Sequence, residues 1–102
     1  MKLLAYSLLT LGLSVSFNSH AASIYAGKAK AAAVCSQCHS IRNHNANSPI
    51  PPLAGRNEEY MEMALKQYRD KTRRSAIMNN IASGLSDRDI NDIASYYNRL
   101  KP

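Results

Sequence analysis

The sequence predicts an all-α domain of three to four helices, and three observations support this fold class. Long stretches favour helix and carry apolar residues at spacings of three and four. Nothing in the chain alternates strands with helices as an α/β domain does. The 102 residues, of which 45% are hydrophobic and 20% charged, fit one globular domain. A two-domain enzyme and a chain too polar to fold are therefore excluded.

Residues 1–21 differ in character from the rest of the chain. Lys2 is followed by a largely apolar run that reaches Phe17 without a further charge, and a small-residue exit ends at Ala21. This order is typical of a secretory signal peptide. An uncleaved membrane anchor is the alternative, but the apolar run has roughly 15 residues where a span needs about 20. We predict cleavage after Ala21 and a mature domain over 22–102.

The mature chain begins with a predicted helix over 24–34, a run rich in Ala and Lys that contains no Pro and leads directly into Cys35. A chain of about 80 residues forms only a marginal hydrophobic core, so such domains usually depend on a disulfide, a metal or a large cofactor. The motif Cys35-Ser36-Gln37-Cys38-His39 offers such a staple.

Three familiar uses of paired cysteines fit this motif poorly. A disulfide between Cys35 and Cys38 would close a very small loop and stabilise little. A redox pair of the thioredoxin kind belongs to a chain with a βαβ pattern. Zinc needs four ligands, and beyond the two cysteines and His39 the nearby nitrogen donor is His44.

The remaining interpretation uses all three side chains, because Cys-x-x-Cys-His is the attachment signature of c-type haem. Two thiols three positions apart on a helical turn can add to the two vinyl groups along one edge of the porphyrin. The next residue, His39, then lies under the iron and can supply an axial nitrogen. We therefore predict one covalent haem c, bound through Cys35 and Cys38, with His39 as a metal ligand.

Two further helices are predicted after the motif. The segment 48–55 contains three prolines and is predicted to be a fixed, extended loop. A middle helix follows the N-cap candidate Asn57 and runs to Lys71, with acidic residues in its first turn. A closing helix over about 86–100 begins with a capping box and continues as an apolar face.

The second axial ligand has four candidates. His44 lies in a polar stretch and would have to turn back around the ring, so we interpret it as a solvated loop residue. Met61 falls in the apolar stripe of the middle helix and is expected in the core, whereas Met63 lies off that stripe and is expected to be half-exposed. Met78 follows the middle helix in a stretch predicted to be irregular. Because a loop methionine can swing over a flat ring, we rank Met78 first.

The order of these motifs resembles the class I c-type cytochromes, most of all the small bacterial periplasmic members and the single-haem halves of the two-haem ones. The resemblance covers residues 24–100 and implies a class I cytochrome c fold wrapped around one covalently bound haem, in the periplasm. The motifs that carry it are Cys35-x-x-Cys38-His39, Pro51-x-Leu53-Ala54-Gly55, Met78, Leu85-Ser86-Asp87 and Tyr96-Tyr97.

The resemblance also implies roles for single residues. Gly27 stands eight positions before the first cysteine, where the family's glycine lets the first and last helices cross, and it should meet Ile93 and Tyr96. An aromatic residue of the family is replaced by Ala31, so this crossing should be less tightly filled. The backbone carbonyl of Pro51 is expected to accept the proton of the axial histidine, in the second shell of the iron.

Two departures from the family pattern stand out. The glycine common just after the middle helix is replaced within Asp70-Lys71-Thr72-Arg73, so the stretch carrying the methionine ligand is expected to leave the helix differently. Tryptophan is absent, which removes one usual partner of a haem propionate. Arg56, Tyr60 and Arg73 are the candidate substitutes.

Histidine and methionine ligation leaves no open position on the iron, so the sequence predicts a carrier of single electrons rather than an enzyme. The alternatives are an electron-accepting haem subunit of a larger dehydrogenase, such as a flavoprotein of sulfur metabolism, and a haem-based ligand-binding protein. The net charge of +6 favours redox partners with acidic docking surfaces. A nucleic-acid partner is not expected after export, and membranes are expected to be met only through redox partners.

Overall fold

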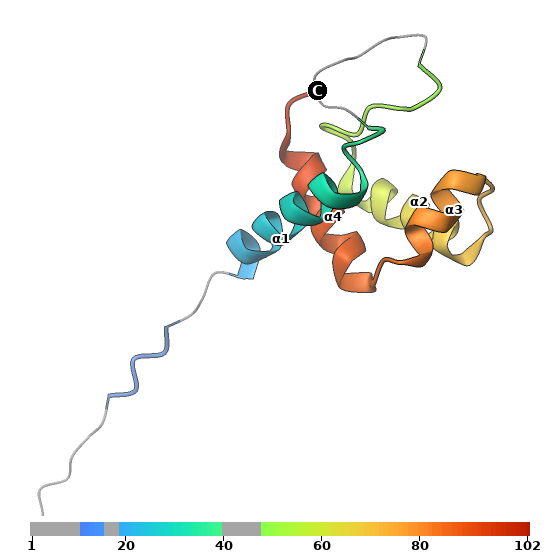
Figure 1. Ribbon diagram of the computed structural model, residues 1–102. Helices are drawn as coiled ribbons and strands as arrows, with labels where there is room; N and C mark the ends of the chain where they lie inside the picture. Colours follow the sequence, from blue (N-terminus) through green and yellow to red (C-terminus); the bar gives the residue numbers. More distant parts are fainter. Residues whose placement is uncertain (1–10, 16–18, 40–47) are drawn as a thin grey trace, which may run out of the picture.

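The computed structural model describes residues 11–15, 19–39 and 48–102, and in this part of the chain it contains helices and no strand. Figure 1 shows α1 and α4 crossing at the centre, with α2 and α3 paired beside them. The predicted all-α class is thus confirmed. Among the residues described, no helix is both long and apolar enough to cross a membrane. The four helices are α1 (Ser19–Val34), α2 (Glu58–Asp70), α3 (Ala76–Ser83) and α4 (Asp87–Arg99).

The first helix begins earlier than predicted. The sequence predicted helix from residue 24, whereas α1 begins at Ser19 and so extends across the predicted cleavage position after Ala21. Neither Pro nor Gly occurs over 19–24, so local propensity alone gives no reason for the helix to stop at that position. Its other end runs directly into the cysteine motif, as predicted.

The crossing of α1 and α4 depends on Gly27. A Cβ atom at this position would lie 2.0 Å from the backbone oxygen of Asp92 and 3.0 Å from the Cβ of Tyr96. Because backbone meets backbone here, only glycine fits. The predicted neighbour Tyr96 is confirmed, the nearest atoms belong to the backbone of Asp92, and the Ile93 side chain is buried in the core.

The core is built mainly on the apolar face of α4. The largest fully buried side chains, Tyr97, Ile90 and Ile93, all come from this helix. Ala31 of α1 is 1% exposed and belongs to the same cluster. Leu53 and Leu65 pack against it while remaining partly exposed. The apolar face predicted for the closing helix is therefore the centre of the fold.

The helix starts predicted from capping residues are confirmed. The Asn57 side chain accepts a hydrogen bond from the backbone N–H of Tyr60 at 2.8 Å, which caps α2. At the start of α4, the Ser86 hydroxyl accepts from the Asp89 backbone, and the Asp89 carboxylate accepts from the Ser86 backbone. Both helices therefore begin where the sequence placed them, to within two residues.

The end of α2 shows how the chain leaves the helix without the glycine that the family commonly has there. Lys71 takes the left-handed backbone conformation, with φ of 64°. Its N–H bonds to the Tyr68 carbonyl and the Thr72 N–H to the Gln67 carbonyl, which is the pair of bonds of a Schellman motif. A lysine thus holds a backbone conformation that normally favours glycine, and the chain still turns sharply out of the helix.

Met78 lies in a helix and not in the irregular stretch that the sequence predicted. Met78 lies in the first turn of α3, where its backbone N–H donates to the Ser75 hydroxyl at 3.3 Å. The Asn79 side chain donates to the carbonyls of Tyr68 and Arg73, both at 2.8 Å, and so fastens α3 to the end of α2. The prediction was wrong because an N-cap serine and these side-chain bonds order a helix of only eight residues.

Candidate haem site

The cysteine motif forms one further turn at the end of α1. The backbone N–H of Cys38 and that of His39 both bond to the carbonyl of Cys35, at 3.2 and 2.9 Å. Cys35 is 8% exposed and Cys38 is exposed, and both are free thiols. Burial raises the pKa of the Cys35 thiol, so it stays protonated at neutral pH. The turn therefore presents one thiol from inside the core and one at its edge.

The structure brings together two predicted site residues, His39 and Pro51. The Nδ1 atom of His39 lies 2.7 Å from the carbonyl oxygen of Pro51. A carbonyl only accepts hydrogen bonds, so Nδ1 carries the ring proton and Nε2 keeps a free lone pair. This tautomer is the one a metal needs when it binds Nε2, because a hydrogen bond at the other nitrogen orients the ring.

The loop that contains Pro51 is fixed at several points. Gly55, with φ of 74°, donates its N–H to the Tyr97 carbonyl at 2.8 Å. The Arg56 Nε donates to the Pro52 carbonyl at 2.7 Å, and the Asn98 side chain donates to the Arg56 carbonyl at 2.8 Å. Arg56, a candidate for a haem propionate, is thus engaged with the backbone of its own loop. These bonds connect the loop whose Pro51 carbonyl contacts His39 to the end of α4.

The described methionines occupy three different environments. Met61 is 5% exposed and belongs to the core, and Met63 is 44% exposed, as the helical stripe predicted for each. Met78 is half-buried on α3. The fourth candidate for the axial position, His44, lies outside the described residues. The environments favour Met78, whose ligation of iron stays a prediction.

Two of the three propionate candidates meet at one place. The Arg73 guanidinium lies 5.8 Å from the centre of the Tyr60 ring and 5.6 Å from that of the Tyr68 ring. Its Nε donates to the Gln67 side chain at 3.2 Å, and one terminal nitrogen lies 3.5 Å from the Tyr60 hydroxyl. Such a cation held against two aromatic rings is oriented and partly desolvated. The Arg73 guanidinium in this position can form an ion pair with a carboxylate such as a haem propionate.

The residues present fit a large flat cofactor. Two thiols on one turn and an imidazole with a free Nε2 are the donor set that haem c uses. Apolar side chains remain exposed in the small domain, including Ile50, Met63 and Ile77. The hydroxyl of Tyr97 is buried without a hydrogen-bond partner among the described residues. Both features indicate a domain whose own side chains do not complete its interior.

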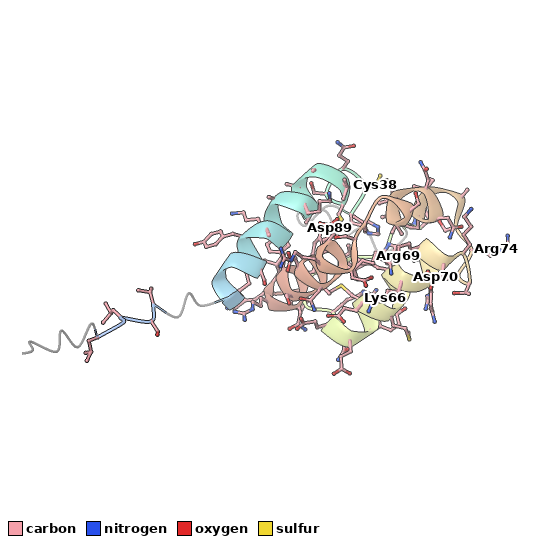
Figure 2. All side chains as sticks on the ribbon, turned by 90° about the horizontal axis from the view of Figure 1, so that it is seen from below. Cys38, Lys66, Arg69, Asp70, Arg74 and Asp89 are labelled. Carbon is pink, nitrogen blue, oxygen red and sulfur yellow. The ribbon has the colours of Figure 1, made fainter. Side chains whose placement is uncertain are left out.

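Several basic residues of the chain are engaged within the molecule. Arg69 pairs with Asp87 at 2.7 Å and also donates to the Leu85 carbonyl, and Lys30 lies 3.7 Å from Asp89. The Arg69 guanidinium holds the pKa of Asp87 below its usual range. Figure 2 shows Cys38 near the end of α1, and it shows Arg74 projecting beyond α2.

Comparison with known proteins identifies the family. The family model described as Cytochrome c matches residues 24–101. Cytochrome c4 of Pseudomonas aeruginosa is 40% identical over 97 residues, which cover 94% of this chain and 47% of that protein. Cytochrome c-554(548) of Halomonas halodenitrificans is 41% identical over 62% of this chain and 80% of its own length. The cytochrome subunit of sulfide dehydrogenase from Chlorobaculum tepidum is 35% identical over 65% and 59%.

This chain spans about half the length of the cytochrome c4 that it matches. The match and the four helices agree with the class I cytochrome c fold, as the resemblance implied. The chain therefore belongs to the cytochrome c family, and its cofactor is covalently attached haem c.

Proposed function

We propose that this protein carries single electrons between redox proteins on a haem c attached through Cys35 and Cys38. His39 and Met78 are the two axial ligands in this proposal. The observation that carries it is the 2.7 Å contact between His39 Nδ1 and the Pro51 carbonyl, which leaves Nε2 free for iron. Haem c supplies an iron that alternates between the ferrous and ferric states.

Each site residue has a distinct task in this proposal. The thiol of each cysteine adds across one vinyl group, so that sulfur bonds to one carbon and the thiol hydrogen passes to the other. Pro51 keeps the imidazole in one tautomer and one orientation. His39 and Met78 would both ligate the iron, which would leave it no open position for a substrate and would raise its reduction potential relative to two nitrogen ligands. The protein is accordingly a carrier and not a catalyst.

The signal-peptide pattern and the exposed basic residues support proposals about location and partners. We propose cleavage after Ala21 and a periplasmic protein, supported by the signal-peptide pattern of residues 1–21. Lys28, Lys66 and Arg74 are exposed and form no ion pair within the described residues. These charges would attract partners with acidic docking surfaces and raise the rate of encounter.

The test is purification from a host that matures c-type cytochromes. We expect one covalent haem per chain, low-spin spectra in both oxidation states and no spectral response to carbon monoxide. Edman sequencing of the product should begin at residue 22. A colourless, compactly folded protein would contradict the proposal, and prompt binding of carbon monoxide by the reduced protein would favour a ligand-binding role instead.

A second candidate function is the electron-accepting subunit of a larger dehydrogenase. The observation that favours it is the 35% identity to the cytochrome subunit of sulfide dehydrogenase. Affinity purification from the native cells separates the two functions. A stoichiometric flavoprotein in the purified material would support the subunit role, whereas a haem protein that elutes alone and exchanges electrons with several acceptors would support the free carrier.

A further inference from the structure

Tyr97 buries a hydroxyl that nothing in the described chain satisfies. Its side chain is 0% exposed and is the largest of the fully buried side chains. The hydroxyl oxygen forms no hydrogen bond with any described residue. Buried polar groups are almost always paired, because leaving one unpaired costs the free energy of removing it from water. An unpaired donor at the centre of a small core therefore calls for a partner.

The polar group beside this hydroxyl is the Cys35 thiol. Burial and the neighbouring Cys35 raise the pKa of Tyr97, and the Tyr97 hydroxyl in turn partly opposes the effect of burial on Cys35. Part of this mutual effect is a weak side-chain hydrogen bond between the two groups, although the Tyr97 hydroxyl has no partner of full hydrogen-bond geometry while Cys35 is a free thiol. Both belong to the same buried cluster, so water is excluded from the pair.

The position of Tyr97 is fixed from the backbone side as well. Its carbonyl accepts the hydrogen bond from the Gly55 N–H at 2.8 Å, and its N–H lies within α4. The ring packs at 5.2 Å from that of Tyr96, with a tilt of 57°. The Tyr97 backbone is therefore tied to the loop that contains Pro51, and its ring packs against that of Tyr96.

We propose that the Tyr97 hydroxyl donates a hydrogen bond to the sulfur of Cys35 in the finished protein, where that sulfur is a thioether. This inference rests on the proposed function. A thiol carries its own proton and competes as a donor, whereas a thioether sulfur has none and can only accept. After attachment of the cofactor the Tyr97 hydroxyl can only be the donor and the Cys35 sulfur only the acceptor, so the buried hydroxyl gains a hydrogen-bond partner.

The bond has an electrostatic consequence for the iron. The hydrogen of the hydroxyl, the positive end of its dipole, points at the edge of the haem to which Cys35 is bonded. In a buried, low-dielectric site this dipole favours the electron-rich ferrous state. Tyr97 is accordingly a positioning residue that holds one thioether and raises the reduction potential.

The experiment compares Tyr97→Phe with Tyr96→Phe in the purified haem protein. Each change removes one hydroxyl from the same helix, but Tyr96 is only partly buried and lies beside Gly27, so it is the matched control. Three readouts are used: the carbon–sulfur stretching band of the thioethers in H2O and D2O, the midpoint reduction potential, and the midpoint of denaturant unfolding.

For Tyr97→Phe we expect a lower reduction potential, a lower unfolding midpoint and loss of the deuterium shift of one carbon–sulfur band. The Tyr96→Phe protein should keep the shift and the potential. The sign of the stability change is decisive, because removing an unpaired buried hydroxyl would raise the unfolding midpoint.

A raised unfolding midpoint, or a wild-type band that does not respond to D2O, would overturn the inference and leave the electron carrier intact. A colourless wild-type protein would overturn both. The absorption spectrum of the wild type therefore distinguishes the failure of this inference from the failure of the proposed function.

Discussion

The two sides of the molecule are ordered in different ways. Where α1 crosses α4, backbone meets backbone at Gly27, and Ala31 and Ile93 are buried almost completely. Where α2 meets α3, Ile77 remains largely exposed and the order comes from polar bonds such as those of Asn79. The first side is therefore expected to be sensitive to added volume, and the second to the loss of helix caps and of Met78, the proposed iron ligand. The substitutions below test this contrast on the free energy of unfolding of the haem protein.

The largest effect is expected from Gly27→Ala. The new Cβ would lie 2.0 Å from the Asp92 oxygen, so the two helices must separate. We expect a loss of about 3 kcal/mol, the upper end of the usual cost of overpacking, despite the better helix propensity of alanine. Denaturant unfolding measures it. Gly84→Ala is the control, because the nearest atom to its Cβ is 3.7 Å away and its φ is −89°. Equal stability of the two variants would contradict the close crossing.

Met78→Ala tests the α2–α3 side. We expect loss of the sulfur-to-iron charge-transfer band of the ferric protein, binding of carbon monoxide by the ferrous protein, and a stability loss of about 2 kcal/mol from the missing side chain. Met63→Ala is the control, since that side chain is 44% exposed, and it should keep the band. A band that survives in Met78→Ala would transfer the ligand role to Met61 or Met63.

Ser86→Ala removes the cap of α4 at the junction of the two sides, and we expect denaturant unfolding to show a stability loss of about 1 kcal/mol.

The capping box also predicts a pH dependence of the free energy of unfolding. The Ser86 backbone N–H lowers the pKa of Asp89 from its usual 3.8, so the folded state gains stability from this carboxylate above that pH. The gain is lost as the pH falls through the lowered value. Unfolding curves of Asp89→Asn should lack this acid dependence, and an unchanged acid limb would argue against the capping box.

The smallest effect is expected from Lys71→Gly, and it is a gain. Glycine adopts the left-handed conformation of this position without steric cost, so we expect about 0.5 to 1 kcal/mol of added stability. Lys71→Ala separates the backbone effect from the loss of the side chain and should be close to neutral. A gain of equal size in both variants would mean that the lysine side chain, and not the backbone, is unfavourable here.

Local patterns in the sequence predicted the parts of the fold that depend on local chemistry. The caps Asn57 and Ser86 fixed the starts of α2 and α4, because a side chain and a backbone N–H three positions on suffice for a cap. Gly27 was placed at the helix crossing through the resemblance to the family, and the clash at Asp92 agrees with it. The turn at Cys35 was likewise predicted, since it continues the hydrogen bonding of α1.

Contacts between distant residues account for what the sequence did not predict. α3 was missed because its order comes partly from Asn79 bonds to carbonyls 6 and 11 residues away. The bond from the Arg56 Nε to the nearby Pro52 carbonyl was not predicted either, and the role of Arg56 toward a propionate stays a prediction. The unpaired hydroxyl of Tyr97 gave no signal at all, because a tyrosine in an apolar stripe looks like any other core residue. The cap Ser75, followed by Gly84 at the other end, was the available clue to α3.

The bond from the Gly55 N–H to the Tyr97 carbonyl ties the loop whose Pro51 carbonyl orients His39 to the last turn of α4. When that turn frays, the bond opens, and the carbonyl of Pro51 four residues upstream gains freedom to release His39. The exchange lifetime of the single Gly55 amide proton is then a measure of how often the His39 ring loses the support of the Pro51 carbonyl. A partner that binds at the end of α4 would slow this exchange and would so hold the His39 imidazole in its orientation.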